Sequence, residues 1–212
     1  MSEQRPTRLS SYWRSSCSYR VRIALNLKWI PYEYVAINLL KGEQLDDVNF
    51  SQSPVHQVPV LEIDGHSLHE SMAIIEYLEE TRPSQTPLLP KDPYLRSVAR
   101  RQALIIAADI QPVQNLRVIK YQKGDAIQWC KHFITLGLIG LEKDLSTSAG
   151  ACCVGDNVTI ADICLVPQVY NARRFDVDMS QFPIISRIAA ALEKLPAFIA
   201  AHPDHQPDAA KQ

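Results

Sequence analysis

The chain has 212 residues, of which 46% are hydrophobic and 21% charged, so it is long enough for one large domain or two small ones with buried cores. Its formal net charge of -1 gives no electrostatic reason to bind nucleic acid or an anionic membrane, and neither partner is expected. The N-terminus is polar, without the apolar core of a signal peptide, and no apolar run approaches the length of a membrane span. These features predict a cytoplasmic protein.

Cysteine and histidine usage gives no sign of a disulfide framework or a metal site. The five cysteines are odd in number and show no C-x-x-C spacing. Adjacent Cys152 and Cys153 could form a strained vicinal bond, but two buried thiols in a reducing compartment are expected. Two H-x-x-H pairs are also unsuitable, because one falls on opposite faces of an expected strand and the other lies in a proline-rich tail. No metal is predicted.

The first 80 residues change hydrophobic periodicity several times. The patterns predict strands over 7–13 and 32–37, a helix over 17–28, a short irregular helix within 41–50, a hairpin over 57–71 and a helix over 72–82. The hairpin turn is Asp64-Gly65, a favoured turn dipeptide, and Ser71 is the expected cap of the helix that follows it. This order predicts an α/β unit whose helices cover a mixed sheet.

The rest of the chain shows helical patterns and no convincing strand. Four prolines within residues 82–93 predict a linker over 84–92, between an α/β domain over 1–83 and an all-helical domain over 93–212. A long helical pattern over 96–121 contains Pro112, which predicts a kink there. Further helices are expected from 125 to about 201, and the last ten residues are expected to be disordered.

A cluster of small polar residues, Ser15, Ser16, Cys17 and Ser18, stands where the first helix is expected to begin. A helix start offers about four unpaired N–H groups and roughly half a positive charge, which suits a thiolate. A free thiol with a pKa near 8.5 is only about 3% ionised at pH 7, and lowering that pKa by about two units requires about 2.7 kcal/mol. A helix terminus (up to about 2 kcal/mol) and a hydroxyl hydrogen bond (about 1.5–3 kcal/mol) together suffice without a histidine base. The alternative is that the serines are ordinary caps and Cys17 a small buried residue.

Two later segments suggest a socket for a peptide-like ligand. Pro59 removes a ladder donor, so its strand lies at an edge or is interrupted, and the backbone of Val58 is left to pair with an extended ligand. Glu70 and Ser71 at the next helix start suit the amine and the carboxylate of an amino-acid head group. The alternatives are a plain edge-strand proline and ordinary helix capping.

Five segments together carry a resemblance over essentially the whole chain: SSCSYRVRIALNLK, QVPVLEIDG, HESMAIIEYLEETRP, QPVQNLRV and VGDNVTIADICLVPQVYNARRF. The chain resembles the zeta class of glutathione transferases. The first segment is highly specific to that class, whereas the VPxL…ES pattern is common to glutathione transferases generally. The resemblance implies a thioredoxin-like first domain, an all-helical second domain, glutathione as cofactor and a homodimer.

Site residues follow from the resemblance by position. Ser15 would face the glutathione sulfur, with Ser16 and Cys17 lining the same catalytic pocket. The other implied contacts are Val58, before a cis Pro59, to the cysteinyl backbone, Glu70 and Ser71 to the γ-glutamyl head, Gln44 to the glycyl end, and Gln111, Asn115 and Arg117 to the ligand region. Gln111 and Asn115 are expected one turn apart on the kinked helix. Arg174 would meet the carboxylates of the acceptor substrate.

The implied activity is isomerisation of a maleyl-type diacid, maleylacetoacetate to fumarylacetoacetate, by thiolate addition, rotation and elimination. Maleylpyruvate isomerisation, conjugation or dehalogenation, thiol–disulfide chemistry at Cys17, and a non-catalytic binding module are the alternatives. The chain departs from the family pattern at three positions. Glu70 stands in place of glutamine, Arg117 in place of serine and Trp29 in place of glycine.

Overall fold

The computed structural model describes residues 6–46, 53–83 and 86–209. The chain forms two compact units, one made of Met1–Thr86 together with Pro196–Gln212, and the other of Pro87–Leu195. The first boundary falls at the expected linker. The segment Pro196–Gln212, which was expected to belong to the helical domain, groups instead with the N-terminal unit.

A mixed four-stranded sheet forms the centre of the first unit, in the strand order β2-β1-β3-β4. Its strands are β1 (Arg8–Ser11), β2 (Glu33–Ala36), β3 (Val60–Ile63) and β4 (His66–His69). β1 runs parallel to β2 and antiparallel to β3, and β3 pairs with β4 through the expected Asp64-Gly65 turn. Alternation along β1 turns Leu9 toward the core, where it is fully buried.

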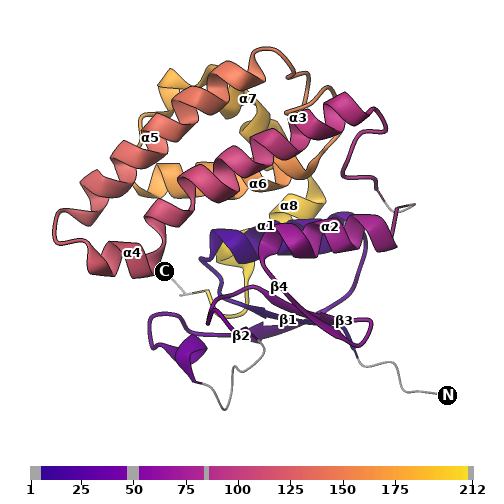
Figure 1. Ribbon diagram of the computed structural model, residues 1–212, viewed down its shortest axis with the longest axis vertical. Coiled ribbons are helices and arrows are strands. Elements are labelled where there is room, and N and C mark those ends of the chain that lie inside the picture. The colour runs from indigo at the N-terminus through magenta and orange to yellow at the C-terminus, as the bar shows by residue number, and fades with distance from the viewer. Residues whose placement is uncertain (1–5, 47–52, 84–85, 210–212) are drawn as a thin grey trace. The chain divides into compact units, whose positions relative to one another are not determined.

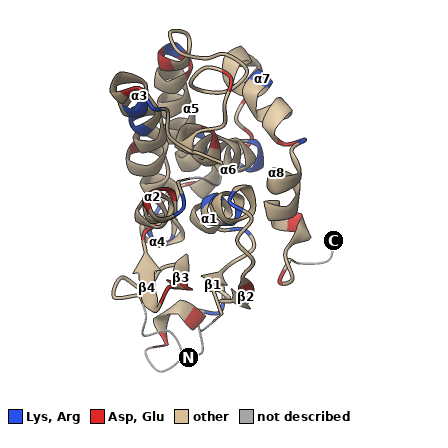
Figure 2. Ribbon diagram, turned by 90° about the vertical axis from the view of Figure 1, so that its right-hand side faces the viewer, with Lys and Arg blue, Asp and Glu red and all other residues tan. Residues whose placement is uncertain are grey.

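Helices α1 (Ser16–Leu27) and α2 (Ser71–Thr81) lie on the same face of this sheet (Figures 1 and 2) and pack against each other. The helix within 41–50 is a single 3-10 turn, η1 (Glu43–Leu45), and the rest of that predicted segment lies outside the described residues from 47 on. The strand and helix order predicted for this unit is therefore confirmed.

The C-terminal segment returns to the first unit, where α8 (Pro196–Ala201) packs along α1. Arg22 of α1 donates through Nε to the carbonyl oxygen of Ala201 at 3.0 Å, and Asn26 donates to the carbonyl of Ala197 at 3.0 Å. A 3-10 turn, η5 (Pro203–His205), follows α8. The prediction of a disordered tail is thus wrong up to residue 209, because α8 and the residues after it bond to the first unit. Residues 210–212 lie outside the description.

The second unit is helical, and α6 (Ile160–Arg174) runs through its core with most of its residues buried. Its other helices are α3 (Pro93–Leu104), η2 (Ile105–Ile110), η3 (Pro112–Gln114), α4 (Leu116–Tyr121), α5 (Ala126–Leu145), η4 (Met179–Gln181) and α7 (Pro183–Leu192). α6 packs against α3 and α7. At its start, the Asp162 carboxylate accepts hydrogen bonds from the N–H (2.8 Å) and hydroxyl (2.9 Å) of Thr159, so the helix begins on a capping box.

The predicted kink at Pro112 is a complete interruption of the helix. η2 has π-type hydrogen bonds, and a 3-10 turn at Pro112 follows it before α4 begins. Pro112 has no N–H to donate, so it removes a helical hydrogen bond and favours a break at this position. Among the described residues, no helix is both long enough and apolar enough to cross a membrane.

Candidate active site

The cluster of small polar residues opens α1 as predicted. Ser15 is the N-cap, with extended backbone angles, and its Oγ accepts the N–H of Ser18 at 3.2 Å. That bond uses an acceptor site of the hydroxyl, so its hydrogen can still be donated to a ligand. Ser15 and Cys17 are half-buried, and Ser16 is buried. Capping and ligand binding are therefore compatible roles for Ser15.

The peptide bond between Val58 and Pro59 is cis, as the resemblance implies. Pro59 directly precedes β3, which pairs with β1 on one side and β4 on the other, so the edge-strand interpretation is wrong. Pro59 is tolerated because it lies outside the ladder. Within the described part of the chain, the backbone of Val58 makes no hydrogen bond, although the residue is only 8% exposed. Both backbone groups can pair with an extended ligand.

The start of α2 differs from the sequence prediction by one residue. Ser71 was expected to cap this helix, but it is the first helical residue, and Glu70 occupies the N-cap. Glu70 is exposed, has a φ of 68°, and its side chain makes no capping bond. A left-handed conformation is costly for a residue with a side chain and is often kept at binding sites. Glu70 therefore provides no side-chain acceptor for the N-terminal N–H groups of α2.

A residue that the sequence analysis did not select joins the starts of α1 and α2. Nη1 of Arg20 donates to Oγ of Ser71 at 3.3 Å and lies 3.9 Å from Sγ of Cys17. Arg20 is 1% exposed and Ser71 4%. One feature of the sequence could have identified Arg20: it is a charged residue within a helix that was predicted to be apolar on two sides. The structure thus brings the expected sulfur pocket and the expected γ-glutamyl socket together.

Gln44 lies on η1, and its amide Oε1 is buried without a hydrogen-bond partner in the described residues. Its backbone carbonyl faces Nδ1 of His56 at 3.1 Å. No hydrogen bond within the described residues links Gln44 or Val58 to the Arg20 cluster. A buried polar atom without a partner costs stability, and a bound ligand could supply the missing donor to Gln44 Oε1.

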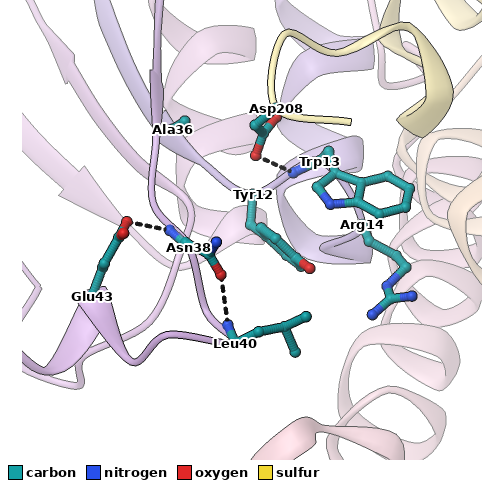
Figure 3. A pocket seen from close by; sticks show the side chains of 8 residues that line it. All are labelled: Tyr12, Trp13, Arg14, Ala36, Asn38, Leu40, Glu43 and Asp208. Carbon is teal, nitrogen blue, oxygen red and sulfur yellow. Dashed lines mark hydrogen bonds between the residues drawn. The ribbon is translucent and has the colours of Figure 1, made fainter. Parts of the chain in front are cut away.

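A cavity of about 580 Å³ opens beside the start of α1 (Figure 3). It is lined by Tyr12, Trp13, Arg14, Ala36, Asn38, Leu40, Glu43 and Asp208. Arg14 directly precedes the N-cap, and its guanidinium lies 5.2 Å from the centre of the Trp13 ring. Sequence reasoning missed Arg14, although a cation next to the serine cluster was visible in the chain.

In the helical unit the expected geometry of Gln111 and Asn115 is wrong. They do not lie one turn apart on a continuous helix, because Asn115 has an extended backbone with ψ at 144° and caps α4. Its Oδ1 accepts the N–H of Arg117 at 3.1 Å, so the Asn115 side chain is engaged in capping. Arg117 is exposed on the first turn of α4. The interruption at Pro112 separates the faces that a regular helix would align.

Arg174 is exposed at the last turn of α6, where Nη1 donates to Oδ1 of Asn171 at 3.4 Å. Its guanidinium stacks at 4.5 Å over the ring of Phe175. Burial raises the pKa of the Cys130 thiol, and the nearby charge of Arg174 partly offsets this effect. No hydrogen bond in the described residues joins Arg174 to Gln111 or Asn115.

Metal-binding clusters were sought among the histidine, cysteine and acidic side chains. None was found in the residues that the structure describes. The five cysteines are free thiols in this structure, and all but Cys17 are buried.

The first unit combines a thioredoxin-like sheet with a cis-proline and two helix starts, the arrangement of a glutathione-binding domain, and residues 9–87 match the family model of the glutathione S-transferase N-terminal domain. The chain is 56% identical over 203 residues to probable maleylacetoacetate isomerase 2 of Drosophila melanogaster, covering 94% of this chain and 89% of that protein. It therefore belongs to the glutathione transferase family, and within it to the zeta class.

Solved structures agree with this assignment. A bacterial zeta-class maleylpyruvate isomerase in its holo form has a TM-score of 0.93 and 42% identity, covering 96% of this chain and all of that one. Maleylacetoacetate isomerase from Anaeromyxobacter dehalogenans, with dicarboxyethyl glutathione and citrate in its active site, has a TM-score of 0.87 and 43% identity. That match covers 97% of this chain and 98% of the other.

Proposed function

We propose that this protein is a glutathione-dependent cis–trans isomerase that converts maleylacetoacetate to fumarylacetoacetate. The observation that carries the proposal is the junction of two helix starts at Arg20, with Ser15 and Cys17 on one side and Ser71 on the other. Relatives of about 50% identity over nearly the whole chain bear that enzyme name. Bound glutathione supplies a thiolate that adds to the activated double bond and leaves once the single bond has rotated.

The residues of the first unit fit glutathione as an extended peptide. The backbone of Val58 has both hydrogen-bonding groups available for the cysteinyl unit. Glu70 offers an exposed carboxylate to the amine of the γ-glutamyl head, and Ser71 offers a hydroxyl to its carboxylate. Gln44, with its unpartnered amide oxygen, is assigned to the glycyl end. Ser16 and Cys17 line the sulfur pocket.

Stabilisation of the thiolate is the task of the α1 N-terminus. The first N–H groups of α1 and the Ser15 hydroxyl form an electropositive seat that lowers the pKa of a thiol placed there. A preorganised donor aimed at a developing negative charge contributes about 2.7–4 kcal/mol to catalysis. Ser15 acts twice in this way, when the thiolate attacks and again when it leaves.

The acceptor substrate carries carboxylates, and arginines are assigned to them. Arg174 neutralises one carboxylate in the proposal, a role that its position in the NARRF segment supports. Gln111, Asn115 and Arg117 are retained as ligand contacts of the helical domain, although the broken helix separates their faces. Arg14, beside the cavity in Figure 3, supplies a second cation of the kind that a diacid requires.

A spectroscopic assay of maleylacetoacetate with and without glutathione tests the proposal. Activity that depends on glutathione is expected, together with retention on glutathione-agarose. Absence of both would favour a transferase-like binding module. Full activity in Cys17→Ala would remove the thiol–disulfide alternative, in which Cys17 is the nucleophile.

A second candidate substrate is maleylpyruvate, because a relative of TM-score 0.93 carries that activity in its name. The two acids are compared side by side at equal enzyme concentration. A kcat/KM for maleylacetoacetate at least tenfold higher supports the proposal, and the reverse order would replace it with maleylpyruvate isomerisation.

The proposal includes a homodimer in the cytoplasm. The helical unit exposes large apolar side chains on α5, Leu136 at 58% and Ile139 at 54%, which suit burial against a second copy. Light scattering on the purified protein is expected to give twice the chain mass of 23.9 kDa. Fractionation of the source cells checks the compartment.

A further inference from the structure

The α1 region contains three buried cations, Arg20, Arg22 and Lys28, and Arg20 has guanidinium nitrogens with no acceptor in the described residues. Arg22 is fully buried but donates to the carbonyls of Ala201 (3.0 Å) and Trp13 (3.0 Å) and to Ser11 Oγ (3.2 Å). Lys28 is fully buried and pairs with Glu79 at 2.8 Å. The charged groups of both residues therefore have hydrogen-bond acceptors within the protein.

Arg20 differs from both. It is 1% exposed, and its Nε and Nη2 atoms are buried without a partner in the described residues, whereas Nε, Nη1 and Nη2 of Arg22 all donate hydrogen bonds. No ion pair in the described residues involves Arg20. Its shorter hydrogen bond, from Nη1 to Ser71 at 3.3 Å, ends on a neutral hydroxyl. Leaving a guanidinium buried without a counter-ion is costly, so the protein maintains a site that favours an added anion.

Two further features place that anion at Ser71. Arginine only donates, so Ser71 Oγ must accept from it, and the Ser71 hydrogen remains available to an acceptor. Ser71 also begins the 11-residue helix α2, whose N-terminus has no side-chain cap and no acidic residue in its first turn. The positive end of the helix, the Ser71 hydroxyl and the buried charge of Arg20 all favour one carboxylate.

Resting on the proposed function, we infer that Arg20 is the counter-charge of the glutathione γ-glutamyl α-carboxylate, which it holds through Ser71 as a positioning residue. The α-carboxylate of the bound ligand supplies the negative charge that Arg20 lacks in the free protein. Arg20 thereby contributes to glutathione affinity and does not act on the reacting atoms.

Calorimetry measures the Kd of two probes for wild type and for Arg20→Met, and the test compares the ratio of the two Kd values in each protein. The probes are glutathione and 4-aminobutyryl-cysteinylglycine, which is glutathione with hydrogen in place of the α-carboxylate. In wild type we expect the missing carboxylate to raise Kd at least thirtyfold. In Arg20→Met that ratio should shrink at least tenfold, and Arg20→Lys, which keeps the charge, should restore part of it.

Thermal unfolding without ligand separates this role from a structural one. Replacing an uncompensated buried charge by an apolar side chain is neutral or stabilising, so Arg20→Met should unfold no more than about 2 °C below wild type. The matched variant Arg22→Met leaves the carbonyls of Ala201 and Trp13 without their donor, so its unfolding temperature should fall by about 5 °C or more.

An unchanged Kd ratio in Arg20→Met overturns the inference, and so does failure of that variant to fold. A change confined to the ultraviolet thiolate band of bound glutathione would assign Arg20 to the sulfur pocket and also overturn it. Wild type that binds neither probe refutes the proposed function itself, which is a distinguishable result.

Discussion

The carboxylate of Asp208 accepts the backbone N–H of Trp13 at 3.0 Å, across 195 residues of sequence (Figure 3). The same carboxylate accepts the Tyr34 hydroxyl at 2.6 Å. Burial, followed by this hydrogen bond, raises the pKa of Tyr34. One acidic residue near the C-terminus thus fixes the loop between β1 and α1, next to the serine cluster, and connects it to β2.

Asp208→Ala should therefore lower the free energy of unfolding by about 1–3 kcal/mol, because it leaves the Trp13 N–H and the Tyr34 hydroxyl without an acceptor. Urea unfolding measures this loss. The control is Asp204→Ala, four residues earlier, whose carboxylate is 56% exposed and lies 3.7 Å from Nδ1 of His202. It should change stability by less than about 0.5 kcal/mol. Equal effects of the two substitutions would contradict the role of Asp208.

The order of the tail could not be predicted from its composition, since the partners of Asp208 are far away in sequence. The hairpin at Asp64-Gly65 and the capping box at Thr159 were predictable because each depends on residues within a few positions. Local pattern therefore predicted the elements and their order well. It failed where the partner is distant in the chain.

In the candidate site, too, local features could be predicted from the sequence and contacts between distant residues could not. Ser15 was predictable as the start of α1, because a cap acts on its own helix. Local pattern could not show that Ser71 lies near Cys17, because Arg20 connects these two residues across α1 and α2. The pairing expected for Gln111 and Asn115 assumed a regular helix, which the turn at Pro112 excludes.

Trp29 provides a stability prediction at the end of α1. The helix ends with hydrogen bonds from Trp29 N to Asn26 O (3.1 Å) and from Ile30 N to Leu25 O (3.0 Å), which make a Schellman motif. Trp29 has a φ of 54° and is 82% exposed, so it bears the left-handed conformation without burying its ring. Glycine adopts this conformation at no steric cost, and Trp29→Gly should stabilise the protein by about 0.5–1 kcal/mol.

Chemical denaturation of Trp29→Gly and Trp29→Ala tests the cause. Alanine removes the ring but keeps the backbone strain, so it should leave stability within about 0.5 kcal/mol of wild type. Stabilisation by alanine as large as that by glycine would point to the exposed ring and exclude the backbone explanation.

Alanine substitutions at two glycines of α5 should have opposite effects on stability. A Cβ added at Gly137 would collide with the Ile110 side chain of η2, whereas a Cβ at Gly140 meets nothing within 4 Å. Gly137→Ala should therefore destabilise the protein by about 1–3 kcal/mol through overpacking. Gly140→Ala should stabilise it by about 0.5–1 kcal/mol, because alanine is the better helix former. Thermal unfolding of both variants decides, and a stable Gly137→Ala would show that the close approach can relax.

The cysteines should differ in reactivity. Burial, and then the charges of Asp162 and Asp156, raise the pKa of Cys152 to about 11, and burial raises the pKa of Cys153 well above its usual value. At pH 8 only about one Cys152 thiol in a thousand is then ionised. Cys17 is half-buried and borders the Ser15 cluster. Iodoacetamide at pH 8 should label Cys17 at least about a hundredfold faster than Cys152 or Cys153.

Peptide mapping by mass spectrometry follows this labelling, with urea-unfolded protein as the control in which all five thiols react. Saturating glutathione should slow the reaction at Cys17. Labelling of Cys152 as fast as Cys17 in the folded protein would show that the loop over 149–155 opens to solvent.

Ser15 allows the capping role and the catalytic role to be separated in one variant. Glycine is accepted at an N-cap with a loss of only a few tenths of a kcal/mol, yet it has no hydroxyl. If the hydroxyl holds the glutathione thiolate, Ser15→Gly should lower kcat about 100-fold or more while the free energy of unfolding barely changes. The pKa of bound glutathione, followed by the ultraviolet thiolate band, should rise in the same variant. Ser15→Thr keeps both cap and hydroxyl and should retain most of the activity, and a Ser15→Gly enzyme with wild-type turnover would mean that the α1 N–H groups hold the thiolate alone.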